Sequence, residues 1–84
     1  MNRAQIEKEV EETFTRLFEV ENPQMDADLR EAYEFDSIDA IELLGEIEKM
    51  LDSELTREEK KQAMEVRTIR QICDYIEELV TRRG

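Results

Sequence analysis

Residues 35–51 read FDSIDAIELLGEIEKML, and this stretch decides the fold. The side chain of Asp36 can accept hydrogen bonds from the free N–H groups of a first helical turn. Asp39 adds negative charge where the backbone dipole of that helix is positive. Ser37 then occupies the first helical position, at the surface. We therefore expect a helix over residues 37–51 that begins beside an exposed serine.

One face of this helix is expected to be buried. Positions at helical spacing along it are apolar except for one glutamate: Ile41, Leu44, Ile47, Glu48 and Leu51. This spacing is typical of an amphipathic helix that packs one side against a core. The acidic residues Asp39, Glu42 and Glu46 fall on or near the opposite side. The helix therefore combines an apolar face, an acidic face and a serine at its start.

The composition favours one small helical domain and excludes several functional classes. The chain has 84 residues, a net charge of −11, two glycines and one proline, which suits helices better than the turns of a sheet. A charge this negative repels nucleic acid and favours encounters with basic protein surfaces. The sequence has no histidine and one cysteine, Cys73, so zinc sites of the usual kinds and histidine-activated nucleophiles are excluded.

Location and assembly are expected to be simple. No stretch approaches the roughly 20 apolar residues of a membrane span, and the N-terminus lacks the apolar run of a secretory signal. No loop has the spacing of a dedicated metal site. We therefore expect a cytoplasmic monomer without a metal ion and without catalytic activity of its own.

A first helix is expected over about residues 3–20. Asn2 and Gln5 form a capping pair at its start, and Pro23 prevents its continuation. Residues 21–35 then form a long connection. Three apolar or aromatic residues at four-residue spacing are expected to fasten it to the core through one irregular helical turn: Met25, Leu29 and Tyr33.

Two more helices complete the expected fold. A capping box at Thr56 starts a short helix that runs to about residue 64 or 65, and a second box at Thr68 starts the last helix. An apolar stripe follows that helix to about Thr81. The expected fold is all-α, with three main amphipathic helices and one short helix in an antiparallel-type bundle, a single domain over residues 1–84.

These features together resemble an acyl carrier protein. The family signature is Asp-Ser-Leu at the start of the second helix, and Asp36-Ser37-Ile38 fits it with a conservative last position. The agreement continues through the helix and into residues 52–55 and 72–76, in the right order. The resemblance implies that Ser37 carries covalent 4′-phosphopantetheine. The thiol of this arm would hold acyl intermediates of fatty acid, lipid or related biosynthesis as thioesters.

The resemblance also implies roles for other residues. Asp36 would lie beside the phosphopantetheinyl transferase during modification, and Ile38 would pack against the base of the arm. That transferase and acyl-processing enzymes with basic docking surfaces would bind an acidic face: Asp39, Glu42, Glu46 and Glu48. Acyl chains would lie in an apolar interior lined by five residues: Leu44, Gly45, Ile47, Ile69 and Ile72.

The chain departs from the family pattern near the serine. The usual Asp-Leu-Gly-x lead-in is replaced by Ala-Tyr-Glu-Phe at residues 32–35. Glu34 therefore stands where a glycine would adopt positive φ at no cost, and another path of the loop is expected. Gly45 stands where a larger apolar residue is common, which would leave extra room for an acyl chain.

Two alternatives stay open. The first is a peptidyl, D-alanyl or polyketide carrier, which an apolar pocket near Gly45 and Leu44 would disfavour. The second is a small acidic helical module that binds other proteins without a prosthetic group. In that module Ser37 would have no special role.

Overall fold

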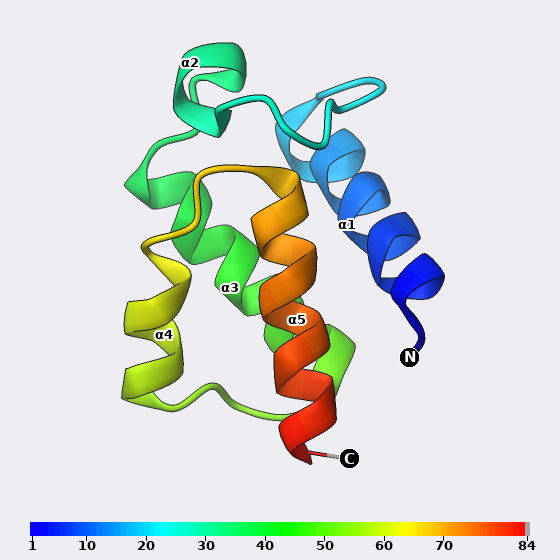
Figure 1. Cartoon of the computed structure of the whole chain (residues 1–84). Coiled ribbons are helices and arrows are strands. Elements are labelled where there is room, and N and C mark those ends of the chain that lie inside the picture. The colour runs from blue at the N-terminus through cyan, green and yellow to red at the C-terminus, as the bar shows by residue number, and fades with distance from the viewer. Residues whose placement is uncertain (84) are drawn as a thin grey trace.

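Five helices make up the part of the chain that the computed structural model describes, residues 1–83. They are α1 (Arg3–Phe18), α2 (Leu29–Tyr33), α3 (Ser37–Leu51), α4 (Arg57–Ala63) and α5 (Ile69–Arg83) (Figure 1). These residues include no strand, so the all-α prediction is confirmed. The short α2 is the helical turn expected within the connection. No helix among them is long and apolar enough to cross a lipid bilayer.

Helix α1 begins and ends at capped positions and packs against α5 and α3. The Asn2 side chain accepts from the N–H of Gln5 at 2.9 Å, and the Gln5 side chain accepts from the N–H of Asn2 at 2.8 Å. The helix ends at Phe18, two residues earlier than expected, because Glu19 turns into the left-handed region with φ 56°. Its buried side chains include Ile6, Val10 and Phe14.

Three phenylalanines connect the core to the start of α3. The ring centroids of Phe14 and Phe35 are 5.7 Å apart, and Phe18 lies edge-on to both, at 5.1 and 5.4 Å. Aromatic pairs of this geometry add stability beyond their buried area. Phe35 is only 8% exposed, so the residue before the α3 cap is anchored in the interior.

The connection over residues 21–35 is fastened to the start of α5. The N–H of Leu29 donates to the carbonyl of Arg67, and the N–H of Arg70 donates to that of Met25, both at 2.9 Å. The Arg70 guanidinium also pairs with Asp26 at 2.6 Å. In Figure 1, α2 accordingly lies across one end of the bundle, near the start of α5. Leu29 is buried as expected, and Met25 and Tyr33 are half-buried.

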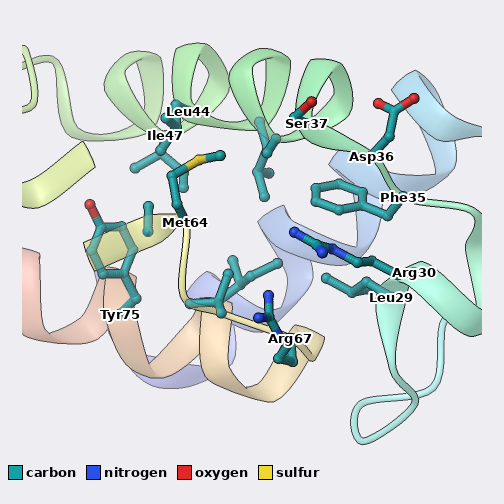
Figure 2. Close-up of a pocket in the computed structure, with 15 residues that line it drawn as sticks. Leu29, Arg30, Phe35, Asp36, Ser37, Leu44, Ile47, Met64, Arg67 and Tyr75 are labelled. Atoms are coloured by element: carbon teal, nitrogen blue, oxygen red, sulfur yellow. The ribbon is translucent and has the colours of Figure 1, made fainter. Parts of the chain in front are cut away.

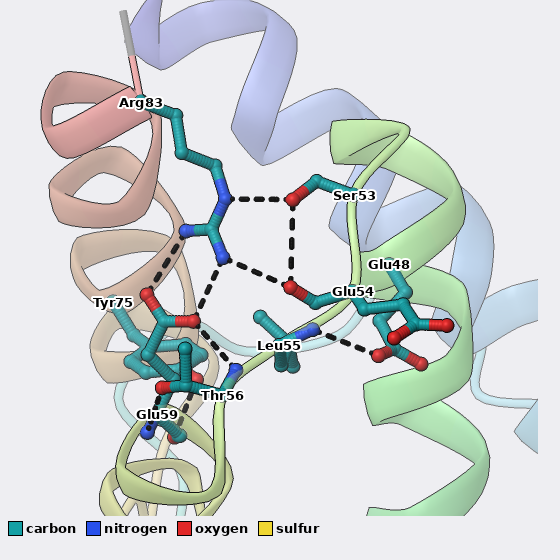
Figure 3. A network of polar contacts seen from close by, with 8 residues as sticks. All are labelled: Glu48, Ser53, Glu54, Leu55, Thr56, Glu59, Tyr75 and Arg83. Carbon is teal, nitrogen blue, oxygen red and sulfur yellow. Dashed lines mark hydrogen bonds and ion pairs between the residues drawn. The ribbon is translucent and has the colours of Figure 1, made fainter.

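A polar network fastens α4 to the end of α5 (Figure 3). Arg83 pairs with Glu59 at 2.7 Å and donates to the carbonyl of Glu54 at 3.2 Å. The Tyr75 hydroxyl donates to the carbonyl of Glu59 at 2.6 Å. The Arg83 guanidinium and the N–H of Thr56 lower the pKa of Glu59 to about 2. This network was not predicted from the sequence, because it joins residues that are far apart in the chain.

Candidate functional site

Ser37 is the first residue of α3. Its side chain takes no part in the cap of this helix, because two aspartates form that cap. Asp36 is the N-cap, and its carboxylate accepts from the N–H of Asp39 at 3.0 Å. In return, the Asp39 carboxylate accepts from the N–H of Asp36 at 3.1 Å. The two residues form a complete capping box. Within residues 1–83 the exposed Ser37 hydroxyl makes no hydrogen bond, so it is available for chemistry.

The surroundings of Ser37 suit a phosphate ester but do not activate the hydroxyl. The first N–H groups of α3 and the positive end of its dipole favour a negatively charged group at this position. The chain has no histidine that could take the proton, and residues 1–83 include no cluster of metal-ligating side chains. The residues present therefore fit a phosphodiester at Ser37.

The loop before Ser37 turns at Glu34, which adopts the left-handed conformation with φ 53° and ψ 34°. The backbone N–H groups of Glu34 and Phe35 both donate to the carbonyl of Leu29. Glu34 therefore adopts positive φ despite its side chain, and the substitution of the usual glycine does not remove this turn. For a residue with a Cβ this conformation is strained. Together Glu34 and Phe35 fix the entry into α3.

An apolar cavity of about 30 Å³ opens beside Ser37 (Figure 2). Its walls come from α2, α3, α4, α5 and the connection before α5. Leu44, Ile47 and Ile72 line it, as the resemblance implied. Leu43, Met64 and Tyr75 also line it, although their sequence pattern did not predict this. A volume of this size is close to what two water molecules need.

Two expected cavity residues lie elsewhere. Ile69 is fully buried in the core but does not line the cavity. Gly45 lines a groove on the surface with Glu48 and Lys49 instead. A Cβ atom built on Gly45 meets no atom within 4 Å, so the missing side chain adds no room inside the bundle.

The exposed side of α3 differs from the expected one. Ile41, which was expected to be buried, is 65% exposed, and Ile38 beside Ser37 is 66% exposed. The prediction for Ile41 was wrong because the buried face instead passes through Leu43 and Ile47. Two isoleucines therefore stand on the surface next to the serine.

The four acidic residues of the expected docking face have different surroundings. Glu46 pairs with Arg16 at 3.0 Å, which lowers the pKa of Glu46, and Glu48 accepts from the N–H of Leu55 at 2.8 Å. Asp39 serves the α3 cap. Glu42 is exposed and makes no ion pair or hydrogen bond with residues 1–83. Of the four, only Glu42 is fully available to a partner.

A comparison with protein families gives one match, to the model described as phosphopantetheine attachment site, over residues 8–76. The matched range contains Ser37, its capping aspartates and most of the cavity wall. Neither a comparison with curated proteins nor one with solved structures finds a match. Members of the family carry 4′-phosphopantetheine covalently, and carrier domains of this kind are typically not catalytic. This chain belongs to the phosphopantetheine attachment site family of acyl carrier-type proteins.

Proposed function

We propose that Ser37 carries the 4′-phosphopantetheine arm and that the chain delivers acyl groups, bound as thioesters, to partner enzymes. The observation that carries this proposal is the free hydroxyl of Ser37 at the start of α3, beside an apolar cavity. Because Asp36 and Asp39 satisfy the cap between them, Ser37 can be esterified without loss of a hydrogen bond in the fold. The arm supplies the thiol on which the cargo is held.

The cargo is proposed to be an acyl group of fatty acid, lipid or related biosynthesis. The deepest cavity residues, Leu43, Ile47 and Ile72, are aliphatic and almost fully buried, which favours an apolar chain over a peptidyl or D-alanyl group. The volume of about 30 Å³ admits only the first atoms of such a chain. A longer chain would require the helices around the cavity to move apart.

The proposed docking surface for partner enzymes combines charge with exposed apolar side chains. Glu42 supplies an unpaired carboxylate, and Ile38 and Ile41 supply apolar contacts close to Ser37. Interfaces with an apolar centre and a charged rim bind specifically, and their charges speed the encounter with a basic surface. The transferase that modifies Ser37 is proposed to bind here, as are acyl-processing enzymes.

The cellular setting is proposed to be the cytoplasm, with the chain acting as a monomeric carrier that is not itself an enzyme. The thiol at the end of the arm must remain reduced to accept cargo, and the cytoplasm keeps thiols in this state.

Intact mass tests the proposal directly. The purified chain is incubated with coenzyme A and a promiscuous phosphopantetheinyl transferase, together with Ser37→Ala and Ser53→Ala. These are the only two serines in the sequence, so Ser53→Ala is a matched control. We expect the wild type and Ser53→Ala to gain one phosphopantetheinyl group and Ser37→Ala to gain none. If the wild type gains nothing even with the transferase of its own organism, the chain is an interaction module instead.

A further inference from the structure

Two arginines line the cavity beside Ser37. Arg30 comes from α2, and Arg67 comes from the connection between α4 and α5; both line the cavity. Figure 2 shows their guanidinium groups directed into the same space beneath α3. The rest of the wall is mainly apolar. The cavity is therefore lined by two cations with which a purely apolar chain would form no ion pair or hydrogen bond.

The backbone holds these two segments side by side. The hydrogen bond from the N–H of Leu29 to the carbonyl of Arg67 joins the neighbour of Arg30 directly to Arg67. The pair of Arg70 with Asp26 fastens the same junction with two further hydrogen bonds, at 2.6 and 3.1 Å. These bonds fix the backbone positions from which the two arginine side chains extend.

Neither guanidinium has a partner within residues 1–83. The chain contains 23 acidic residues, yet within residues 1–83 the guanidinium groups of Arg30 and Arg67 form no ion pair and no hydrogen bond. Only their backbone N–H groups donate to side chains, to Asp28 and Gln71. Five other arginines do form ion pairs: Arg3, Arg16, Arg70, Arg82 and Arg83. The acidic residue in the cavity wall, Asp36, accepts a hydrogen bond from the N–H of Asp39. Two unpaired arginines in one opening suit an anionic oxygen group, which guanidinium binds with two hydrogen bonds.

We propose that Arg30 and Arg67 form an anion clamp, which binds an anionic oxygen group of the tethered arm at the cavity mouth. The inference rests on the proposed function of Ser37. Two sources share this chemistry: the phosphodiester of the arm itself and a carboxylate on the carried acyl group. Arg30 also lines a second groove together with Ser37 and two carboxylates, Asp36 and Glu34, which places it beside the point of attachment. The clamp would hold the arm over the cavity and keep it out of bulk solvent.

The test compares three loaded forms of the ¹⁵N-labelled wild type. They are made with coenzyme A, butyryl-coenzyme A and succinyl-coenzyme A, and intact mass verifies each load. The butyryl and succinyl groups have equal chain length and differ in the terminal carboxylate. The Arg30 and Arg67 Nε–Hε signals are assigned with Arg30→Gln and Arg67→Gln. Their hydrogen exchange should slow by about 1.4- to fivefold on loading, as expected for exposed charge pairs.

Arg57 supplies the matched control. It is also unpaired within residues 1–83, but it lies at the start of α4 and does not line the cavity. The exchange of the Arg57 Nε–Hε group should not change in any of the three loaded forms. Slowing at Arg30 and Arg67 in all three forms would identify the phosphodiester as the bound group, and slowing in the succinyl form alone would identify the cargo carboxylate.

Failure of the clamp and failure of the proposed function give different results. If mass shows a loaded Ser37 but exchange at both arginines is unchanged in every form, the clamp is refuted and the carrier function stands. If the wild type accepts no arm from its own transferase, both are refuted.

Discussion

Moving a glycine from α3 to the turn before it should stabilise this chain. Gly45 lies inside α3, where a methyl group would meet no atom within 4 Å. Glu34 occupies a left-handed turn, with φ 53°, although it carries a full side chain. Glycine thus weakens α3 at position 45, whereas position 34, where the backbone conformation favours glycine, has a glutamate. Gly45→Ala and Glu34→Gly should each raise the free energy of unfolding.

The size of each effect follows from the local conformation. Alanine in place of glycine inside a helix raises the free energy of unfolding by about 0.5–1 kcal/mol. In the folded chain, the left-handed conformation costs a residue with a Cβ about 1–2 kcal/mol, and glycine removes this cost. Glycine also makes the unfolded chain more flexible, which lowers the free energy of unfolding by about 0.4–1 kcal/mol. At the middle of each range, Glu34→Gly should therefore raise the free energy of unfolding by about 0.8 kcal/mol. The two sites share no hydrogen-bond partner, so the double variant should gain about 1–2 kcal/mol.

Urea unfolding followed by circular dichroism measures these differences. Each kcal/mol should also raise Tm by about 4–8 °C in a domain of this size. Glu34→Gln is the control, because it removes the charge and keeps the side chain in the strained conformation. The reasoning would be refuted if Glu34→Gly were no more stable than Glu34→Gln, or if Gly45→Ala were less stable than the wild type.

Two further predictions concern ionisable groups. The pKa of Glu59 falls from 4.5 to about 2 in the fold, mainly through Arg83, so this pair stabilises the chain fully above pH 4.5 and loses its effect as the pH falls toward 2. Arg83→Gln should accordingly lower the urea midpoint at neutral pH and differ little from wild type near pH 2. An equal fall in the midpoint at both pH values would contradict a stabilising role for the Glu59–Arg83 pair. Burial raises the pKa of the Cys73 thiol to about 11, so the unloaded native chain should react with a thiol reagent at neutral pH only after unfolding. Rapid reaction of the native chain, measured by absorbance, would contradict the buried placement.

The sequence predicted those features that depend on neighbouring residues. The capping boxes at Asn2, Thr56 and Thr68 are all present in the structure, and Asp36 caps α3, because a cap involves residues only three positions apart. The return hydrogen bond to Asp39, which makes the α3 cap a complete box, was not predicted. The signature over residues 36–38 likewise lies at the start of a helix, where the resemblance implied it.

The errors have identifiable physical causes. At about 100° per residue, Ile41 lies roughly 160° around the helix from the buried Leu43, so a stricter helical projection would have placed it outside. Gly45 was assigned to the cavity for its size alone, although its side of α3 faces a surface groove. The ion pair between Glu59 and Arg83 could not be predicted from the sequence. Within its own helix, Glu59 completes the capping box of α4, and Arg83 is a basic residue in the last turn of α5. The two residues meet only when α4 and α5 pack together.

The capping box at the start of α3 has a consequence for cells that hold both unloaded and loaded chains. The two aspartates complete the cap without Ser37, so an unloaded chain already has a capped α3, and an arm on the serine breaks no hydrogen bond of that helix. If α3 is the docking surface, an unloaded chain is a decoy that occupies a partner enzyme and delivers nothing. The yield of a pathway that uses this carrier would then depend on the ratio of loaded to unloaded chains, and surplus unmodified protein would inhibit it.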